Sequence, residues 1–188
     1  MWHTIFHTLT WTGLRRSELL GLRWKDLDLL FGTLRVTQVL HQLSDGSYVY
    51  SEAKAKRAVS LAYCLLLRAH QEKQDRDAAA LGVSLTDESL VFCHVVDSAP
   101  LRPGTVGQAF RRKVKQLGFN GVRLHDLRHT HASLMLQQGV NPKTVEERIG
   151  YSSVTITLDT YSHLLPGIQE EAVSKFDAAM DAALALNN

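Results

Sequence analysis

Cysteine is scarce in this chain of 188 residues, which has only Cys64 and Cys93. Neither stands in a CxxC or Cys/His ligand spacing, so we expect two buried thiols and not a disulfide scaffold. The chain has no run of about 18 apolar residues, which excludes a membrane-spanning helix. Residues 1–4 lack the basic and apolar regions of a secretion signal, and together these absences favour a cytoplasmic protein.

Charges of both signs are present, but they are unevenly distributed along the chain. The net charge is +2, whereas residues 169–188 hold four acidic residues against one lysine, a balance of −3 that leaves +5 on residues 1–168. A basic body with an acidic, partly apolar tail favours an anionic partner for the body and a separate role for the tail. The length is that of one ordinary domain.

The periodicity of apolar residues predicts a mainly helical α+β domain with a small three-stranded antiparallel sheet in its N-terminal third. Residues 33–39 alternate polar and apolar side chains, as a half-buried strand does. A turn at residues 44–47 leads to further extended segments at 48–50 and 57–61. We expect helices over residues 2–10, 17–22, 62–79, 105–117, 127–138 and 142–150, another around residue 161, and a last one after residue 167.

Three short segments place side chains that are suited to binding and attacking a phosphate. His125 and Arg128 are three residues apart, so both project from one face of a helix. Arg15 follows Gly13, and a glycine allows the backbone to approach closely at a helix start. Tyr161 supplies a phenol between small and polar neighbours. The combination indicates a phosphate clamp with a tyrosine nucleophile.

Phosphodiester transfer has a task for each of these residue types. Its transition state gathers charge on the non-bridging oxygens, and a guanidinium offers them paired donors and a permanent positive charge. A histidine or lysine can protonate the leaving 5′-oxygen, and a tyrosine hydroxyl can store the bond as a phosphotyrosine ester. Neither a metal nor another cofactor is needed where arginines supply the electrostatic stabilisation.

Each residue also has a plain structural explanation, which the sequence leaves open. Arg15 alone can be an ordinary surface arginine, and Tyr161 alone can be a core or interface aromatic. His125 and Arg128 can be a helix-start histidine with a solvated neighbour. His125 and His129 have the spacing of a zinc pair, but the glutamate of an HExxH motif and a nearby cysteine are missing.

Basic residues outside these segments are candidates for contact with a nucleic-acid backbone. The expected helix 105–117 carries four of them on more than one face, so some must face either solvent or phosphate. Lys54 and Lys56 stand before the expected strand 57–61, where a basic turn is the simpler explanation.

Taken together and in this order, the segments resemble the tyrosine recombinase (phage integrase) family. Residues 12–26, TGLRRSELLGLRWKD, look like the family's first arginine box, and residues 124–132, LHDLRHTHA, look like its H-x-x-R box. Residues 147–153, ERIGYSS, with residues 159–163, DTYSH, look like the segment that holds its nucleophile. The similarity runs from about residue 5 to residue 170, and the joint match is highly specific although each box alone is not.

The resemblance implies a role for each matching residue. Arg15 and Arg128 would clamp the scissile phosphate. His125 would assist proton transfer, and Tyr161 would form the 3′-phosphotyrosine link. The resemblance also implies that the enzyme is a DNA strand transferase that uses no metal or other cofactor.

Other positions match the family less regularly. Lys54 lies near the place of the family's hairpin lysine, the general acid, but the segment is shorter than usual and Lys56 is the alternative. Tyr151 stands where the family usually has His or Trp, and we expect it as a substitute ligand because a phenol can still donate a hydrogen bond to a phosphate oxygen. The predicted DNA contacts are Arg16, Lys56, Arg111, Arg112 and Lys115.

By this resemblance, residues 1–188 would be the catalytic domain of a site-specific recombinase that cleaves and rejoins double-stranded DNA, with the family's upstream DNA-binding domain absent. Residues 166–188 would form a tail helix that docks on a neighbouring protomer in a tetramer on DNA, or else packs within its own chain. Two other functions stay open. One is a strand relaxase like a type IB topoisomerase, and the other is a non-catalytic DNA-binding remnant, to which Tyr151 and the absent domain point.

Overall fold

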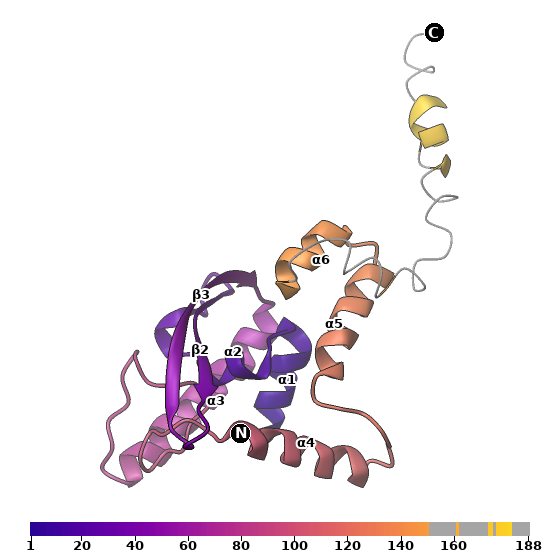
Figure 1. The fold of residues 1–188 in the computed structure, drawn as a ribbon. Helices are drawn as coiled ribbons and strands as arrows, with labels where there is room; N and C mark the ends of the chain where they lie inside the picture. The colour runs from indigo at the N-terminus through magenta and orange to yellow at the C-terminus, as the bar shows by residue number, and fades with distance from the viewer. Residues whose placement is uncertain (151–160, 162–172, 175, 182–188) are drawn as a thin grey trace.

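The computed structural model describes residues 1–150, 161, 173–174 and 176–181, which form a mainly helical α+β domain (Figure 1). The fold class predicted from the sequence is therefore confirmed. In chain order the elements are α1 (Trp2–Thr12), α2 (Arg16–Leu20), the 3-10 helix η1 (Trp24–Asp26), β1 (Leu27–Asp28), β2 (Thr33–Gln42), β3 (Tyr48–Ala58), α3 (Leu61–Ala80), α4 (Pro103–Gln116), α5 (Asp126–Gln137) and α6 (Pro142–Ile149).

Helices α1 and α2 lie at the centre of the molecule, between the sheet and α5 (Figure 1). Helix α1 packs against both α3 and α5, and α2 packs against β2. Helix α4 runs along the base of the domain in the same view. The two predicted arginine boxes, one around α2 and one at the start of α5, thus belong to neighbouring elements.

Helix α1 buries threonines without leaving their hydroxyls unpaired. Thr8 donates to the carbonyl of Thr4 at 2.7 Å, and Thr12 donates to the carbonyl of Thr8 at 2.6 Å. Such back-bonding to the preceding turn removes the cost of burying a hydroxyl. The helix ends at Gly13, whose φ of 64° is left-handed and whose N–H bonds to the carbonyl of Leu9.

The sheet differs from the prediction in its strands. Its order is β1-β2-β3 with both pairs antiparallel, and β3 is one continuous strand where the sequence predicted separate segments at 48–50 and 57–61. Val36 faces Ala55 whereas Gln38 faces Glu52, so β3 holds one extra residue between these pairs. This bulge breaks the alternation that marks a strand. Lys54 and Lys56 therefore lie within β3 and not in a basic turn.

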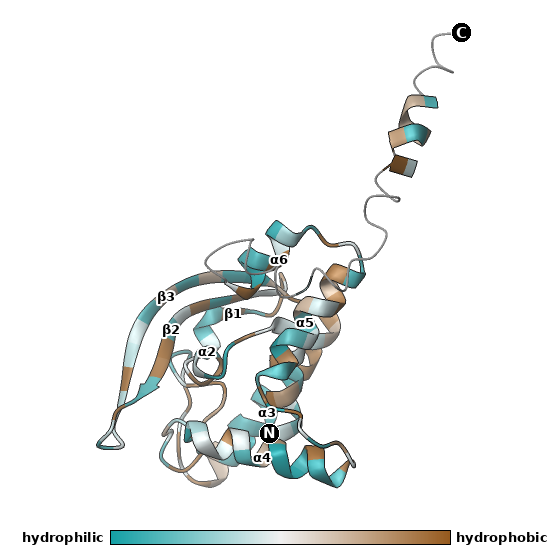
Figure 2. Cartoon of the chain, turned by 45° about the vertical axis from the view of Figure 1, so that its right-hand side comes forward, coloured by the Kyte–Doolittle hydropathy of each residue, from teal (hydrophilic) through white to brown (hydrophobic). Residues whose placement is uncertain are grey.

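Apolar side chains form two separate clusters. The larger cluster joins α1, α2, the sheet and α3, and it includes Ile5, Leu19, Leu34, Tyr63 and Phe92. The smaller one joins α5 and α6 and consists of Ala132, Leu136, Val145, Ile149 and Tyr161. Hydrophobic residues alternate with hydrophilic ones along β2 and α5, as expected for elements with one buried face (Figure 2).

The predicted state of the cysteines is confirmed, since Cys64 and Cys93 are both buried free thiols. Burial raises the pKa of both thiols, which keeps them protonated. Within the described part of the chain, no helix has the length and apolarity needed to cross a membrane.

Candidate active site

The C-terminal end of α6 gathers guanidiniums from three other elements. Gly150 ends this helix with a φ of 68°, a left-handed conformation that glycine adopts without strain. The last carbonyl groups of a helix have no partner within it and carry partial negative charge. Arg57 of β3 donates from Nε to the carbonyl of Arg148 at 2.8 Å, and Arg15 donates from Nη2 to the carbonyl of Gly150 at 2.8 Å.

Arg128 of α5 joins this helix end to the start of the first arginine box. Its Nη2 donates to the carbonyl of Ile149, and its Nη1 donates to the carbonyl of Gly13 at 2.5 Å. The side chain is buried, with 2% of the residue exposed. The guanidinium of Arg128 is therefore fixed between residue 13 and residue 149.

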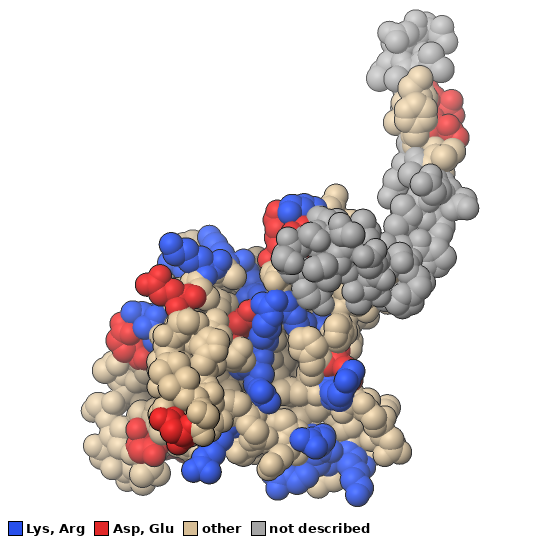
Figure 3. Space-filling view, in the orientation of Figure 1, with Lys and Arg blue, Asp and Glu red and all other residues tan. Residues whose placement is uncertain are grey.

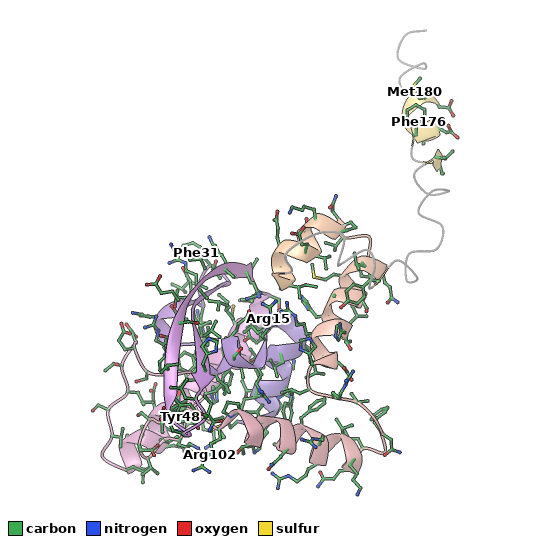
Figure 4. All side chains as sticks on the ribbon, in the orientation of Figure 1. Arg15, Phe31, Tyr48, Arg102, Phe176 and Met180 are labelled. Carbon is green, nitrogen blue, oxygen red and sulfur yellow. The ribbon has the colours of Figure 1, made fainter. Side chains whose placement is uncertain are left out.

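Arg15 stands at the N-cap of α2 and is oriented by Glu18. The Glu18 carboxylate accepts from the Arg15 backbone N–H at 2.8 Å and from its Nη1 at 2.9 Å. Arg57 approaches the same carboxylate at 3.5 Å. The Arg15 side chain is 43% exposed, so it is open to a ligand from solvent. Figure 4 places Arg15 between α2 and α5 at the centre of the domain.

Positively charged side chains gather at the end of α6. Arg128 and Arg148 donate to neutral carbonyl oxygens, while Glu18 pairs with Arg15 and Arg57. A carbonyl satisfies a hydrogen bond without cancelling the charge of the donor, and four guanidiniums converge at this helix end. Figure 3 shows Lys and Arg side chains in a column between the sheet and α5. Such a site is suited to an anion.

His131 and Arg148 fasten α1 to the end of α6, which sequence reasoning did not find. Arg148 donates from Nε to His131 Nε2 at 2.9 Å, so the imidazole is neutral and its Nδ1 donates to the carbonyl of Thr10 at 3.0 Å. Burial first and the Arg148 charge second lower the pKa of His131 to about 4. Arg148 also donates to the carbonyls of Ala58 and Trp11. Arg57, His131 and Arg148 thus hold in place the end of α6, to which the two clamp residues Arg15 and Arg128 donate.

His125 precedes α5 and faces the clamp. With Arg16 and Arg128 it lines a pocket of about 240 Å³, whose other walls are Leu9, Leu14 and Leu124. Burial first, then the neighbouring His129, Arg128 and Arg15, lower the pKa of His125, which favours the neutral imidazole. A neutral imidazole can accept or donate a proton, as phosphoryl chemistry requires.

Tyr161 lies at the same end of α5. Its ring is buried in the α5–α6 cluster, with 3% of the residue exposed, and its hydroxyl lies 2.6 Å from His129 Nδ1. The rings of His129 and His125 meet edge to face at 4.9 Å between centroids. The structure therefore brings together Arg15, Arg128, His125 and Tyr161, linked through Gly13, the end of α6 and His129.

Comparison with known proteins identifies the family of this chain. The sequence profile described as "Phage integrase family" matches residues 3–167. The chain belongs to the phage integrase family. The ICEBs1 integrase of Bacillus subtilis (strain 168) is 34% identical over 178 residues, which cover 92% of this chain and 48% of that protein. A tyrosine recombinase XerC-like protein of Caldanaerobacter subterraneus is 30% identical over 182 residues, covering 86% of this chain and 45% of that protein.

Solved structures show the same fold. The Tn1549 transposon integrase in complex with transposon right end DNA superposes with a TM-score of 0.74 at 23% identity, covering 94% of this chain and 58% of that one. The XerA recombinase gives a TM-score of 0.64 at 20% identity, covering 93% of this chain and 62% of that one. The chain spans about half the length of the curated relatives it matches.

In this member of the phage integrase family, the two candidate lysines lie on the hairpin and not in the clamp. Lys54 and Lys56 are exposed on β3, Lys56 opposite the exposed Arg35, and Lys54 within the bulge. The hydrogen bonds of the clamp, within the described part of the chain, involve neither lysine. The choice between Lys54 and Lys56 stays open, and Tyr151 lies outside the described residues.

The basic residues predicted on α4 are exposed at the base of the domain (Figure 3). Arg111 and Lys115 face solvent, while Arg112 lines a groove of about 690 Å³ together with aromatic residues of α1 such as Trp2 and Phe6. Arg16 donates to the carbonyl of Pro103 at 3.2 Å and so connects α2 to the start of α4. The DNA contacts predicted for these residues stay predictions.

Proposed function

We propose that the chain is the catalytic part of a site-specific DNA recombinase, which cleaves and rejoins strands through a 3′-phosphotyrosine intermediate. One observation carries the proposal. Arg15 and Arg128 donate to the adjacent carbonyls of Gly150 and Ile149, and the Tyr161 hydroxyl bonds to His129, whose ring contacts His125 at the start of α5. A phosphate bound by the two guanidiniums would thus lie near a candidate nucleophile and two imidazoles.

Each step uses a group of this chain. Arg15 and Arg128 bind the non-bridging oxygens of the scissile phosphate and stabilise the charge that develops on them. The Tyr161 oxygen forms a bond to phosphorus while the bond from phosphorus to the 5′-oxygen breaks. The 5′-oxygen takes a proton from Lys54, with Lys56 as the alternative, and His125 assists proton transfer at the phosphate. Attack by a 5′-hydroxyl on the phosphotyrosine reverses these steps and rejoins the strand.

The proposed partner is double-stranded DNA. The Tn1549 integrase was solved with transposon DNA, and the XerH recombinase was solved bound to its difH substrate. Together with the ICEBs1 integrase these relatives favour integration or excision of a mobile element, carried out in the cytoplasm. The proposed backbone contacts are Arg16, Lys56, Arg111, Arg112 and Lys115.

Assembly on DNA is a further part of the proposal. We expect a tetramer of protomers, with the tail of residues 166–188 exchanged between neighbours. The described residues 173–174 and 176–181 of this tail are helical and expose Val173, Phe176 and Met180. Three apolar residues on an exposed helix are suited to docking on another protein surface.

Covalent capture tests the proposal. The chain would be incubated at low salt with nicked duplexes whose sequence around the nick is randomised, and adducts would be resolved on a denaturing gel. We expect a covalent protein–DNA adduct that Tyr161→Phe abolishes. DNA binding without an adduct would support the non-catalytic remnant instead. An adduct accompanied by relaxation of supercoiled plasmid without exchange of strands between duplexes would support the relaxase.

A further inference from the structure

His129 contacts the hydroxyl of Tyr161, and none of the roles assigned so far uses it. Its Nδ1 lies 2.6 Å from Tyr161 Oη, the distance of a strong hydrogen bond. The tyrosine ring itself packs among Leu136, Val145 and Ile149, so its hydroxyl is the part that leaves the apolar cluster and meets a polar partner. In the sequence, the only feature that singles out His129 is its spacing of a zinc pair with His125.

His125 and His129 lie one turn apart at the start of α5 and contact different groups. His125 lines the 240 Å³ pocket with Arg16 and with Arg128, one of the two guanidiniums of the proposed clamp. His129 stands one turn further along, outside the lining of that pocket, and its ring meets His125 edge to face at 4.9 Å. The imidazole beside Arg128 is therefore His125, and the one on the Tyr161 hydroxyl is His129.

We infer that His129 is the general base that takes the proton from Tyr161 during strand cleavage. The inference rests on the proposed function. A neutral His129 with its proton on Nε2 offers Nδ1 as an acceptor to the Tyr161 O–H. As the Tyr161 oxygen bonds to phosphorus, its proton passes to Nδ1, and the bond from phosphorus to the 5′-oxygen breaks. The 5′-oxygen takes its own proton from a separate acid. During rejoining, His129 returns its proton to the tyrosine oxygen.

The charged groups around this pair fit the assignment. Asp126 and Arg128 lie on the same helix, and Arg15 reaches toward His125 from α2. After burial and His129, the two guanidiniums also lower the pKa of His125, so His125 stays neutral in the resting site. They also stabilise the negative charge that grows on phosphate and tyrosine oxygens. A bound phosphodiester adds negative charge next to His125, whose ring lies against His129. This charge favours the imidazolium that forms on His129 once the proton has moved.

A purely positioning role for His129 makes a different prediction. Asparagine can keep a hydrogen bond to the Tyr161 hydroxyl, because its side-chain oxygen falls near the place of Nδ1, but it cannot take up a proton at neutral pH. His129→Asn therefore separates the hydrogen bond from the basicity. General bases contribute about 10²- to 10⁴-fold to a rate.

The experiment compares wild type and His129→Asn on the randomised nicked duplexes, carrying either oxygen or sulfur as the bridging 5′ atom at the scissile phosphate. A sulfur leaving group needs no proton, so it restores a variant that lacks the acid but not one that lacks the base. We expect His129→Asn to slow capture by about 10²-fold or more with both leaving groups. Its rate should rise with pH, since hydroxide can replace the base, and its affinity for DNA should match that of wild type.

Two results would contradict the role of His129 as the base, and a third would contradict the proposed function. Capture by His129→Asn within about threefold of wild type would make His129 a positioning residue, because that loss is far below the range for a general base. Restoration by sulfur would make it the acid. A wild type that forms no adduct would remove the proposed function itself, whereas the first two results leave it intact. His94→Phe, an exposed histidine in the turn after Cys93, is the control and should leave capture and DNA affinity unchanged.

Discussion

Arg15 and Arg128 carry the same guanidinium in different surroundings. Arg128 is 2% exposed and is held by carbonyls on both sides, while the side chain of Arg15 is 43% exposed and shares its charge with Glu18. The guanidinium of Arg128 is therefore held in place by the fold, whereas the side chain of Arg15 can still adjust to a ligand. A planar fork of donors is needed at Arg128, since a lysine could not reach the carbonyls of residues 13 and 149 at once.

Gly13 is where a single added methyl group would disturb this clamp. A Cβ built on Gly13 would lie 2.8 Å from His131 Cδ2, and the φ of +64° is unfavourable for other residues. We expect Gly13→Ala to lower the free energy of unfolding by about 2 to 4 kcal/mol, from about 1 to 2 kcal/mol of backbone strain and the rest from the clash. Urea denaturation followed by circular dichroism would measure it.

Gly82→Ala is the matched control for that substitution. Gly82 has a φ of +68°, and nothing lies within 4 Å of a Cβ built there. This variant keeps the backbone strain without the contact and should lose about 1 to 2 kcal/mol. An equal loss at the two glycines would show that the approach of His131 to residue 13 costs nothing.

At the scale of elements, the end of α6 organises the site. Its last carbonyls accept from β3, α5 and the start of α2, so the sheet and three helices are fixed relative to one another by one helix terminus. Asn141 caps the other end of α6, where its side chain accepts from the Lys143 N–H at 2.8 Å. Both ends of α6 therefore depend on polar contacts, and its middle on Val145 and Ile149.

The sequence predicted the helices of this site better than strand β3 and the buried Arg57, which hold the site in place. Asn141 and the glycines after α1 and α6 mark helix ends by local chemistry, so α6 was predicted nearly to the residue. Helix α3 was predicted within one residue at each end, although its N-cap Ser60 was placed in the extended segment 57–61. Strand β3 was missed in part because a bulge interrupts its alternation. The buried Arg57 was missed because its acceptor, the carbonyl of Arg148, is 91 residues away, and burial of an arginine depends on such a partner.

His131 and Arg148 should behave as one unit in stability. The Arg148 Nε donates to His131 Nε2, and both side chains bond to carbonyls near the end of α1. We expect His131→Phe and Arg148→Met each to destabilise the fold by about 1 to 3 kcal/mol. The double variant should lose about 1 kcal/mol less than the sum, since either change already breaks their shared bond.

A double-mutant cycle by urea denaturation would measure this coupling. Phenylalanine keeps a ring of similar size against Gly13, so the cycle reports the polar contacts and not the loss of packing. A pair of residues outside the contact, His131→Phe with Lys73→Met on the exposed face of α3, is the control and should be additive. Additive losses for His131 and Arg148 would contradict the coupling.

Within the described part of the chain, four histidines have a lowered pKa, so the stability of the fold responds to acid. His7, His70, His125 and His131 all have a pKa lowered chiefly by burial. For each of them the unfolded chain binds a proton more readily than the folded chain. The exposed carboxyls of Asp45 and Glu88 also have a lowered pKa, but they titrate at more acidic pH. The two groups of residues therefore act in separate pH windows.

We expect the free energy of unfolding to fall as the pH decreases from about 6.5 to about 4. His131 contributes most, because its pKa drops from 6.5 in the unfolded chain to about 4 in the fold. Its contribution is complete above pH 6.5, declines through this window as the unfolded chain takes up the proton, and levels off below pH 4. The loss from this group is on the order of 3 kcal/mol. Urea denaturation at a series of pH values would give the slope, and His131→Phe should flatten most of it. An unchanged slope in that variant would mean that the imidazole does not stay neutral beside Arg148.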